Sequence, residues 1–140
     1  MSDIRVALDV EIPSDVNEIE RVVELVRREC VGLHFPSRAC TLNIPVALSE
    51  AISNAILRGN REDLRKHVRV RAMVDDRHLV LEISDEGAGF EFDECIIDPT
   101  TPDQLEREDG RGLFLMQKLM DRVECFTRGG NVVRLTLNRR

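Results

Sequence analysis

The sequence of 140 residues contains no tryptophan and no tyrosine, and only 4% of its residues are aromatic. Proteins that bind single-stranded nucleic acid use aromatic side chains as stacking platforms, so this class is disfavoured. Basic residues are also outnumbered, because 20 Lys and Arg stand against 26 Asp and Glu, for a formal net charge of −6. Nucleic-acid affinity depends on cations that neutralise phosphates, and we therefore expect no direct nucleic-acid ligand.

Long uninterrupted apolar runs are also missing. No stretch approaches the roughly eighteen apolar residues of a membrane span, and the first residues lack the basic and apolar regions of a signal peptide. We therefore expect a cytoplasmic protein that does not contact a membrane. Four cysteines, at positions 30, 40, 95 and 125, form no Cys-x-x-Cys pair, which favours reduced thiols over a zinc site or disulfides. The apolar content of 42% predicts one compact domain over residues 1–140.

Hydrophobic periodicity predicts five strands and three helices. The expected strands are 4–10, 68–72, 79–83, 123–126 and 132–137, with a hairpin turn at 75–77. The expected helices run from about 15 to 32, from 44 to about 58, and from about 112 to 121, and Pro45 is tolerable only near the start of the second. Residues 91–109 have no period and are interpreted as a long lid-like loop. The predicted fold class is an α/β (α+β) two-layer sandwich, with the helices on one face of a mixed, mostly antiparallel sheet.

A short glycine-containing segment, Asp85-Glu86-Gly87-Ala88-Gly89, follows the third expected strand. A carboxylate at a strand end can accept a hydrogen bond from an exocyclic amine such as that of adenine. Gly87 and Gly89 let the backbone approach a base where a Cβ atom would collide. Turn chemistry alone would produce the same pattern, so an ordinary strand-turn remains an alternative.

A second glycine segment, Gly110-Arg111-Gly112, stands where the loop becomes the third helix. Unpaired backbone amides at a helix start attract phosphate, and Arg111 adds a positive charge there. The alternative is a flexible hinge before a core helix, because Leu113 and Phe114 begin an apolar stripe. The chain contains no Gly-x-x-x-x-Gly-Lys-Ser/Thr segment, which excludes a P-loop.

Glu50 and Asn54 lie four residues apart and therefore on the same side of the second expected helix. A Glu can take the proton of an attacking hydroxyl, and an Asn carbonyl is a neutral oxygen ligand for a magnesium ion that also holds phosphates. Arg58, one turn further on, can reach phosphate or solvent. The spacing alone equally allows two solvated polar side chains. In combination with the glycine segments, the pattern predicts a pocket for ATP.

Taken together, these segments resemble a known family. The matching stretches are Ser49–Ala55, Asp85–Phe90, Asp98–Thr100 and Gly110–Met116, followed by Leu119-Met120-Asp121. In this order and at these separations, they resemble the bacterial anti-sigma factor serine/threonine kinases of the Bergerat-fold (GHKL) ATPase superfamily. The resemblance covers nearly the whole chain and is weakest before about residue 40.

The resemblance implies a Bergerat-type fold that binds ATP and Mg²⁺, captures an RNA polymerase sigma factor, and phosphorylates a Ser or Thr of an anti-anti-sigma partner of the STAS class. It also implies a homodimer. By position, Glu50 matches the catalytic base, Asn54 the magnesium ligand and Asp85 the adenine contact. The other matching nucleotide-binding positions are Arg58, Gly87, Gly89, Phe90, Gly110, Arg111, Gly112, Leu113 and Phe114.

One position departs from the family pattern, because Asn131 stands where the family often has a Thr after two glycines. Two other functions remain open from the sequence. The first is a catalytically silent, nucleotide-dependent binding module that sequesters a regulatory partner. The second is the catalytic domain of a histidine kinase, although no histidine of the chain lies in a recognisable phosphoacceptor helix.

Overall fold

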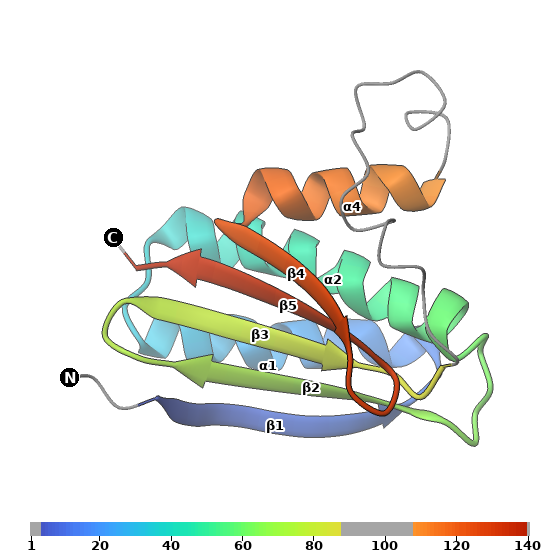
Figure 1. The fold of residues 1–140 in the computed structure, drawn as a ribbon. Helices are drawn as coiled ribbons and strands as arrows, with labels where there is room; N and C mark the ends of the chain where they lie inside the picture. Colours follow the sequence, from blue (N-terminus) through green and yellow to red (C-terminus); the bar gives the residue numbers. More distant parts are fainter. Residues whose placement is uncertain (1–3, 88–107, 140) are drawn as a thin grey trace.

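The structure is a computed structural model that describes residues 4–87 and 108–139. Its five strands form one sheet in the order β1-β2-β3-β5-β4, and each neighbouring pair is antiparallel (Figure 1). The strands are β1 (Arg5–Pro13), β2 (His67–Val74), β3 (His78–Ser84), β4 (Arg122–Thr127) and β5 (Asn131–Asn138). All five predicted strands are present, and the sheet is antiparallel throughout these residues rather than mixed.

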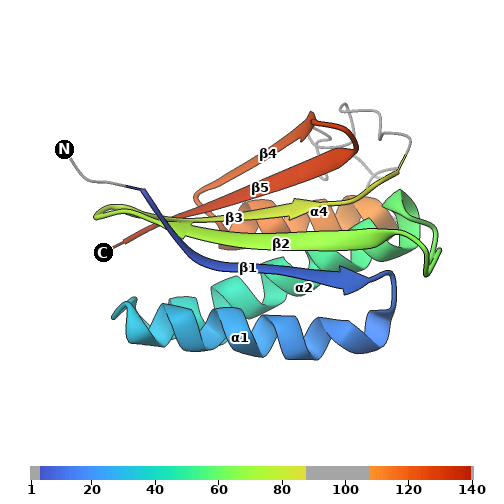
Figure 2. The same ribbon diagram turned by 90° about the horizontal axis from the view of Figure 1, so that it is seen from below.

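Three helices cover one face of this sheet, and no helix of the described residues covers the other face (Figure 2). They are α1 (Ile19–Gly32), α2 (Ile44–Asn54) and α4 (Glu108–Leu119). A 3₁₀ turn, Val16–Glu18, leads into α1, and Asp15 caps it by accepting a hydrogen bond from the Asn17 amide. The predicted two-layer sandwich of sheet and helices is confirmed.

The core lies between the sheet and the helices. There the apolar face of the strands, which recurs every second residue, meets the apolar faces of the helices, which recur about every 3.6 residues. Alternate residues of β2 are buried there, beginning with Val68 and Val70, and α2 buries Leu48 and Ile52 against them. By length and composition alone, one helical segment among the described residues, Ala39–Gly59, could cross a membrane. In this fold that segment is the central helix of the core.

Helical structure around α2 begins earlier than predicted. A π-helical turn, Ala39–Asn43, precedes α2, and a second one, Ala55–Gly59, follows it. Pro45 thus stands inside a longer helical segment and not at its first turn. Proline has no N–H to donate to the carbonyl four residues earlier, and the wider turn just before it accommodates that loss, as the Ile44 amide donates to the Ala39 carbonyl.

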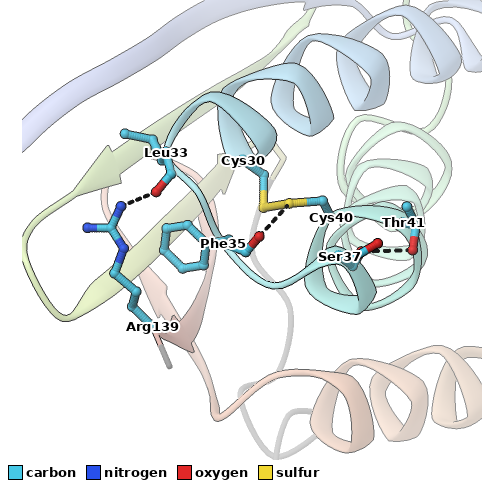
Figure 3. Close-up of a disulfide and its surroundings, with 7 residues drawn as sticks. All are labelled: Cys30, Leu33, Phe35, Ser37, Cys40, Thr41 and Arg139. Carbon is cyan, nitrogen blue, oxygen red and sulfur yellow. Dashed lines mark hydrogen bonds between the residues drawn. A yellow bond between two sulfur atoms is a disulfide. The ribbon is translucent and has the colours of Figure 1, made fainter.

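A disulfide between Cys30 and Cys40 joins the last turn of α1 to the π-helical turn before α2 (Figure 3). The Cα atoms lie 5.6 Å apart, within bridging range, and both residues are buried. No cysteine in the described part of the chain is a free thiol, so the prediction of reduced thiols is wrong there. The separation of ten residues carries no sequence signature, because only the turn between the helices brings the two side chains together.

Candidate functional site

Glu50 and Asn54 lie on α2 with both side chains half-buried, on the side of the helix that faces α4. Gly112 of α4 is buried directly against them. A Cβ atom at Gly112 would lie 2.8 Å from Glu50 Oε2 and 3.6 Å from Asn54 Nδ2. The structure therefore brings Gly112 of the second glycine segment against the acid/amide pair, and Gly112 leaves the space that the Glu50 carboxylate occupies.

The third helix starts four residues before its predicted position, at Glu108. The first four N–H groups of a helix have no partner within it, so Gly110 and Arg111 fall in that first turn and Gly112 follows it. Glycine has a low helix propensity, which suggested a loop at these positions, but packing of α4 on α2 overrides that preference. The start of the helix therefore lies before Gly112, and Gly112 is the residue that lies against Glu50.

Asp85 directly follows β3 and is almost fully buried. Its Oδ1 atom accepts hydrogen bonds from the Gly87 amide at 2.8 Å, from the Asn131 amide at 3.3 Å and from Asn131 Nδ2 at 3.1 Å. Burial raises the pKa of this carboxyl above its ordinary value, and the hydrogen bonds from Gly87 and Asn131 partly counteract that rise. Asn131 Nδ2 also lies 3.4 Å from Oδ2, so three donor groups hold the carboxylate in one orientation, chiefly through Oδ1.

The Oδ2 atom of Asp85 points at Gly59, the last residue of the helical segment that carries Glu50. A Cβ atom at Gly59 would lie 2.0 Å from Oδ2, and one at Gly87 would lie 2.1 Å from the Gly59 carbonyl oxygen. Both positions therefore require glycine for close approach. The sequence singled out Gly87 but missed Gly59, although a glycine nine residues after Glu50 and one turn past Asn54 was a usable signal.

Asn131, the first residue of β5, is buried and binds Asp85 directly. Besides its two donations to Oδ1, its carbonyl accepts a hydrogen bond of 2.9 Å from the Asp85 amide. At this position, where the resembled family often has a Thr, the carboxamide of Asn131 thus lies against the Asp85 carboxylate. It fixes the orientation of Asp85 from the strand next to β3 in the sheet.

A cavity of about 490 Å³ is lined by Gly59 and Asn131, two residues that contact the Asp85 carboxylate. Three of its lining side chains are cationic, which suits an anionic ligand. The lining residues are Arg58, Gly59, Asn60, Arg61, Asp63, Lys66 and Asn131. Of these, the sequence predicted Arg58, which is exposed, and it missed Arg61 and Lys66 because no local pattern links them to the glycine segments.

Several predicted site residues lie outside the described residues. Others lie in α4, but their side chains are not among those described. Gly89 and Phe90 belong to the first group, together with residues 91–107 of the expected loop, and Arg111 and Leu113 to the second; the last two residues of the expected loop, 108–109, are instead the start of α4. Phe114 is half-buried on α4, and Lys118 Nζ lies 5.4 Å from its ring centroid. In the described part of the chain, no group of three or more His, Cys, Asp or Glu side chains could hold a metal ion. A magnesium site would therefore depend on Asn54 and on the phosphates of a bound nucleotide.

Comparison with known proteins adds sequence and fold relationships. The profile of the histidine kinase-like ATPase domain matches residues 12–137. The serine-protein kinase RsbW of Bacillus subtilis is 38% identical over 100 residues, which cover 67% of this chain and 62% of that protein. The anti-sigma F factor of Clostridium acetobutylicum is 32% identical over 100 residues, which cover 70% of this chain and 68% of that protein. The chain therefore spans somewhat less than two thirds of the first relative's length.

Two solved structures share the fold. The RsbU and RsbW domains of a Mycobacterium tuberculosis protein align with a TM-score of 0.66 at 17% identity, over 94% of this chain and 32% of that one. The mycobacterial sensor histidine kinase MprB aligns with a TM-score of 0.57 at 16% identity, over 95% of this chain and 99% of that one. At these identities the likeness concerns the arrangement of strands and helices alone.

Proposed function

The chain belongs to the histidine kinase-like ATPase family, and within it to the anti-sigma factor serine kinases, and on this basis we propose that it is an ATP-dependent protein serine/threonine kinase. Membership of an ATPase family implies that it binds ATP. The proposed acceptor is a Ser or Thr hydroxyl on an anti-anti-sigma protein of the STAS class, and the proposed second partner is an RNA polymerase sigma factor. We further propose that it works in the cytoplasm as a homodimer.

One observation supports this function most strongly: the two ends of the candidate site lie on one helical segment. Glu50 and Asn54 face Gly112 near the middle of that segment, and Gly59, which faces Asp85, is its last residue. Gly59 stands nine positions after Glu50, which corresponds to roughly 14 Å along the axis at the rise of an α-helix. This length suits a nucleotide that lies along the helix, with its base at Asp85 and its terminal phosphate near Glu50.

The geometry at Asp85 supports a role for this residue in base recognition. Its Oδ1 is engaged by three donors, whereas Oδ2 accepts one longer hydrogen bond, at 3.4 Å from Asn131 Nδ2, so Oδ2 keeps the greater acceptor capacity for an exocyclic amine beside Gly59. An amine at position 6 is present in adenine, whereas guanine has a carbonyl there, so the carboxylate favours ATP over GTP. The cations around the cavity at this end, including Arg58 and Lys66, give it a positive charge that favours an anionic ligand such as a nucleotide.

Phosphoryl transfer needs positioning and charge neutralisation more than covalent help. In the proposed reaction, the hydroxyl oxygen of the acceptor bonds to the γ-phosphorus, the bond from that phosphorus to the oxygen of ADP breaks, and the hydroxyl proton passes to the Glu50 carboxylate. Asn54 offers a neutral oxygen ligand beside Glu50, which fits magnesium, and a bound magnesium ion would neutralise the phosphate charge. The N-terminal turn of α4, which ends just before Gly112, offers backbone amides that would favour phosphate.

The test is phosphate transfer from isotopically labelled ATP, with magnesium, to a purified STAS-domain partner, followed by intact mass and phosphosite mapping. We expect one Ser or Thr of the partner to be labelled. Glu50→Gln should abolish transfer and leave ATP binding intact, while Glu20→Gln, a matched change at an exposed position of α1, should leave both intact. ATP binding without transfer to any tested partner would favour a silent sequestering module instead.

A further inference from the structure

Asn60 directly follows the helical segment that carries Glu50, and its side chain is buried, with 1% of the residue exposed. Its backbone amide donates to the Ala55 carbonyl at 2.8 Å, which closes the last turn of that segment. The two residues after it, Arg61 and Glu62, both have positive φ angles, so the chain turns sharply away at this point. Asn60 thus marks the boundary between the segment and the connection to β2.

The carboxamide of Asn60 bonds to three different parts of the fold. Nδ2 donates to Ser14 Oγ at 2.9 Å, just after β1, and to the His67 carbonyl at 3.0 Å, at the start of β2. Ser14 in turn donates to the Lys66 carbonyl at 2.7 Å. On the other side, Oδ1 of Asn60 accepts a 2.8 Å hydrogen bond from the Glu86 amide. The Asn60 side chain therefore donates two hydrogen bonds and accepts one, and each of the three partners lies in a different part of the fold.

The acceptor contact is the one that reaches the candidate site. Glu86 stands between Asp85, the proposed base contact, and Gly87, whose amide donates to the Asp85 carboxylate. Gly59, the neighbour of Asn60 in sequence, is in close contact with the carboxylate and with Gly87. The hydrogen bond from Glu86 to Asn60 thus fastens the middle of this three-residue segment to the end of the helix that carries Glu50 and Asn54.

We propose that Asn60 is a positioning residue for base recognition, which holds Asp85 at a fixed place relative to the catalytic helix through its hydrogen bond with the Glu86 amide. This inference rests on the proposed nucleotide site. It explains why an asparagine suits the position, because its side chain donates to two oxygens and accepts from an N–H at the same time. An aspartate would keep the acceptor but lose the donors, and it would add a buried charge near Asp85.

The test compares two variants that break different contacts of Asn60. Asn60→Ala removes all three, whereas Ser14→Ala removes one donor contact and leaves the Glu86 amide bonded to Asn60. Both should lower stability, which chemical denaturation measures. Dissociation constants for ATP and for inosine triphosphate, which carries a carbonyl in place of the 6-amine, are then measured by calorimetry on each folded variant.

We expect Asn60→Ala to weaken ATP binding about tenfold, because a buried amide loses its partner, and to weaken inosine triphosphate binding much less. The preference for ATP should therefore shrink in this variant and stay as in the wild-type protein in Ser14→Ala. In the apo protein, hydrogen exchange of the Glu86 amide should accelerate in Asn60→Ala and not in Ser14→Ala. This second readout is independent of nucleotide binding.

Three outcomes would overturn the inference. If both variants lost ATP affinity in proportion to their loss of stability, Asn60 would be a structural residue only. If Asn60→Ala kept the full preference for ATP over inosine triphosphate, the residue would not act through Asp85. If the wild-type protein bound no ATP, the proposed function itself would fail, and this result is distinguishable because it needs no variant.

Discussion

Gly59→Ala sets helix propensity against packing at the proposed base contact, and the structure indicates that packing dominates. Alanine is favoured over glycine in a helix by up to about 1 kcal/mol, and Gly59 ends a helical segment without a positive φ angle. The added Cβ, however, would lie 2.0 Å from Asp85 Oδ2 and 2.4 Å from Asp85 Cγ. The buried carboxylate would have to move, and its hydrogen bonds from Gly87 and Asn131 would be strained or lost.

The size of the effect follows from these contacts. Overpacking in a well-packed site costs about 1–3 kcal/mol, and hydrogen bonds to a charged group contribute about 1.5–3 kcal/mol each. We therefore expect Gly59→Ala to lower the free energy of unfolding by about 2 kcal/mol after the gain in propensity, and to weaken ATP binding at least tenfold. Denaturant titration measures the first quantity and calorimetric titration with ATP the second.

Gly32→Ala is the matched control for this variant. Gly32 ends α1 as Gly59 ends its own segment, but a Cβ atom there would meet nothing within 4 Å. We expect this variant to be as stable as the wild-type protein or slightly more stable, with unchanged ATP affinity. The reasoning would be refuted if Gly59→Ala matched Gly32→Ala in both stability and ATP affinity.

The remaining predictions concern acid, reduction and a buried charge. Because burial raises the pKa of Asp85 above its ordinary 3.8, ATP affinity should fall with acidification while the carboxyl protonates, and Asp85→Asn should abolish that pH dependence in calorimetric titrations. Breaking the Cys30–Cys40 disulfide should lower the free energy of unfolding by about 3 kcal/mol, and a Cys40→Ala variant as stable as the oxidised protein would contradict this estimate. Burial opposes ionisation of Glu82, but hydrogen bonds from two arginines, Arg134 among them, outweigh the effect of burial and lower the pKa of Glu82. The stability that ionised Glu82 contributes should therefore be present above its unfolded-state pKa and be lost as the pH falls through the lower folded-state pKa. Glu82→Gln should lower the free energy of unfolding by about 3 kcal/mol at neutral pH. If the wild-type protein had the same free energy of unfolding at neutral and acidic pH, ionised Glu82 would not contribute to stability in this way.

Features with a local signature were predictable from the sequence. The alternation of Val68 and Val70 and the apolar stripe of α2 specified the strand and helix that meet in the core, because burial of one face has a fixed period. The spacing of Glu50 and Asn54 was likewise sufficient to place both side chains on one side of α2. These predictions depended on residues within one or two turns of each other.

Features that depend on long-range contact were missed. Asn60 bonds to the amide of Glu86, 26 residues further along the chain, and nothing near Asn60 in the sequence indicates that contact. Gly59 needs to be glycine because of Asp85, which the fold brings against it. The start of α4 and the Cys30–Cys40 disulfide were mispredicted for the same reason, since tertiary packing decides whether a glycine joins a helix and whether two thiols meet.

A crystal structure with magnesium and a non-hydrolysable ATP analogue tests the central claim most directly. We expect the adenine amine to lie within hydrogen-bond distance of Asp85 Oδ2, with the nucleotide along the helical segment and the terminal phosphate beside Glu50 and Asn54. A base bound elsewhere, or a terminal phosphate remote from Glu50, would contradict it.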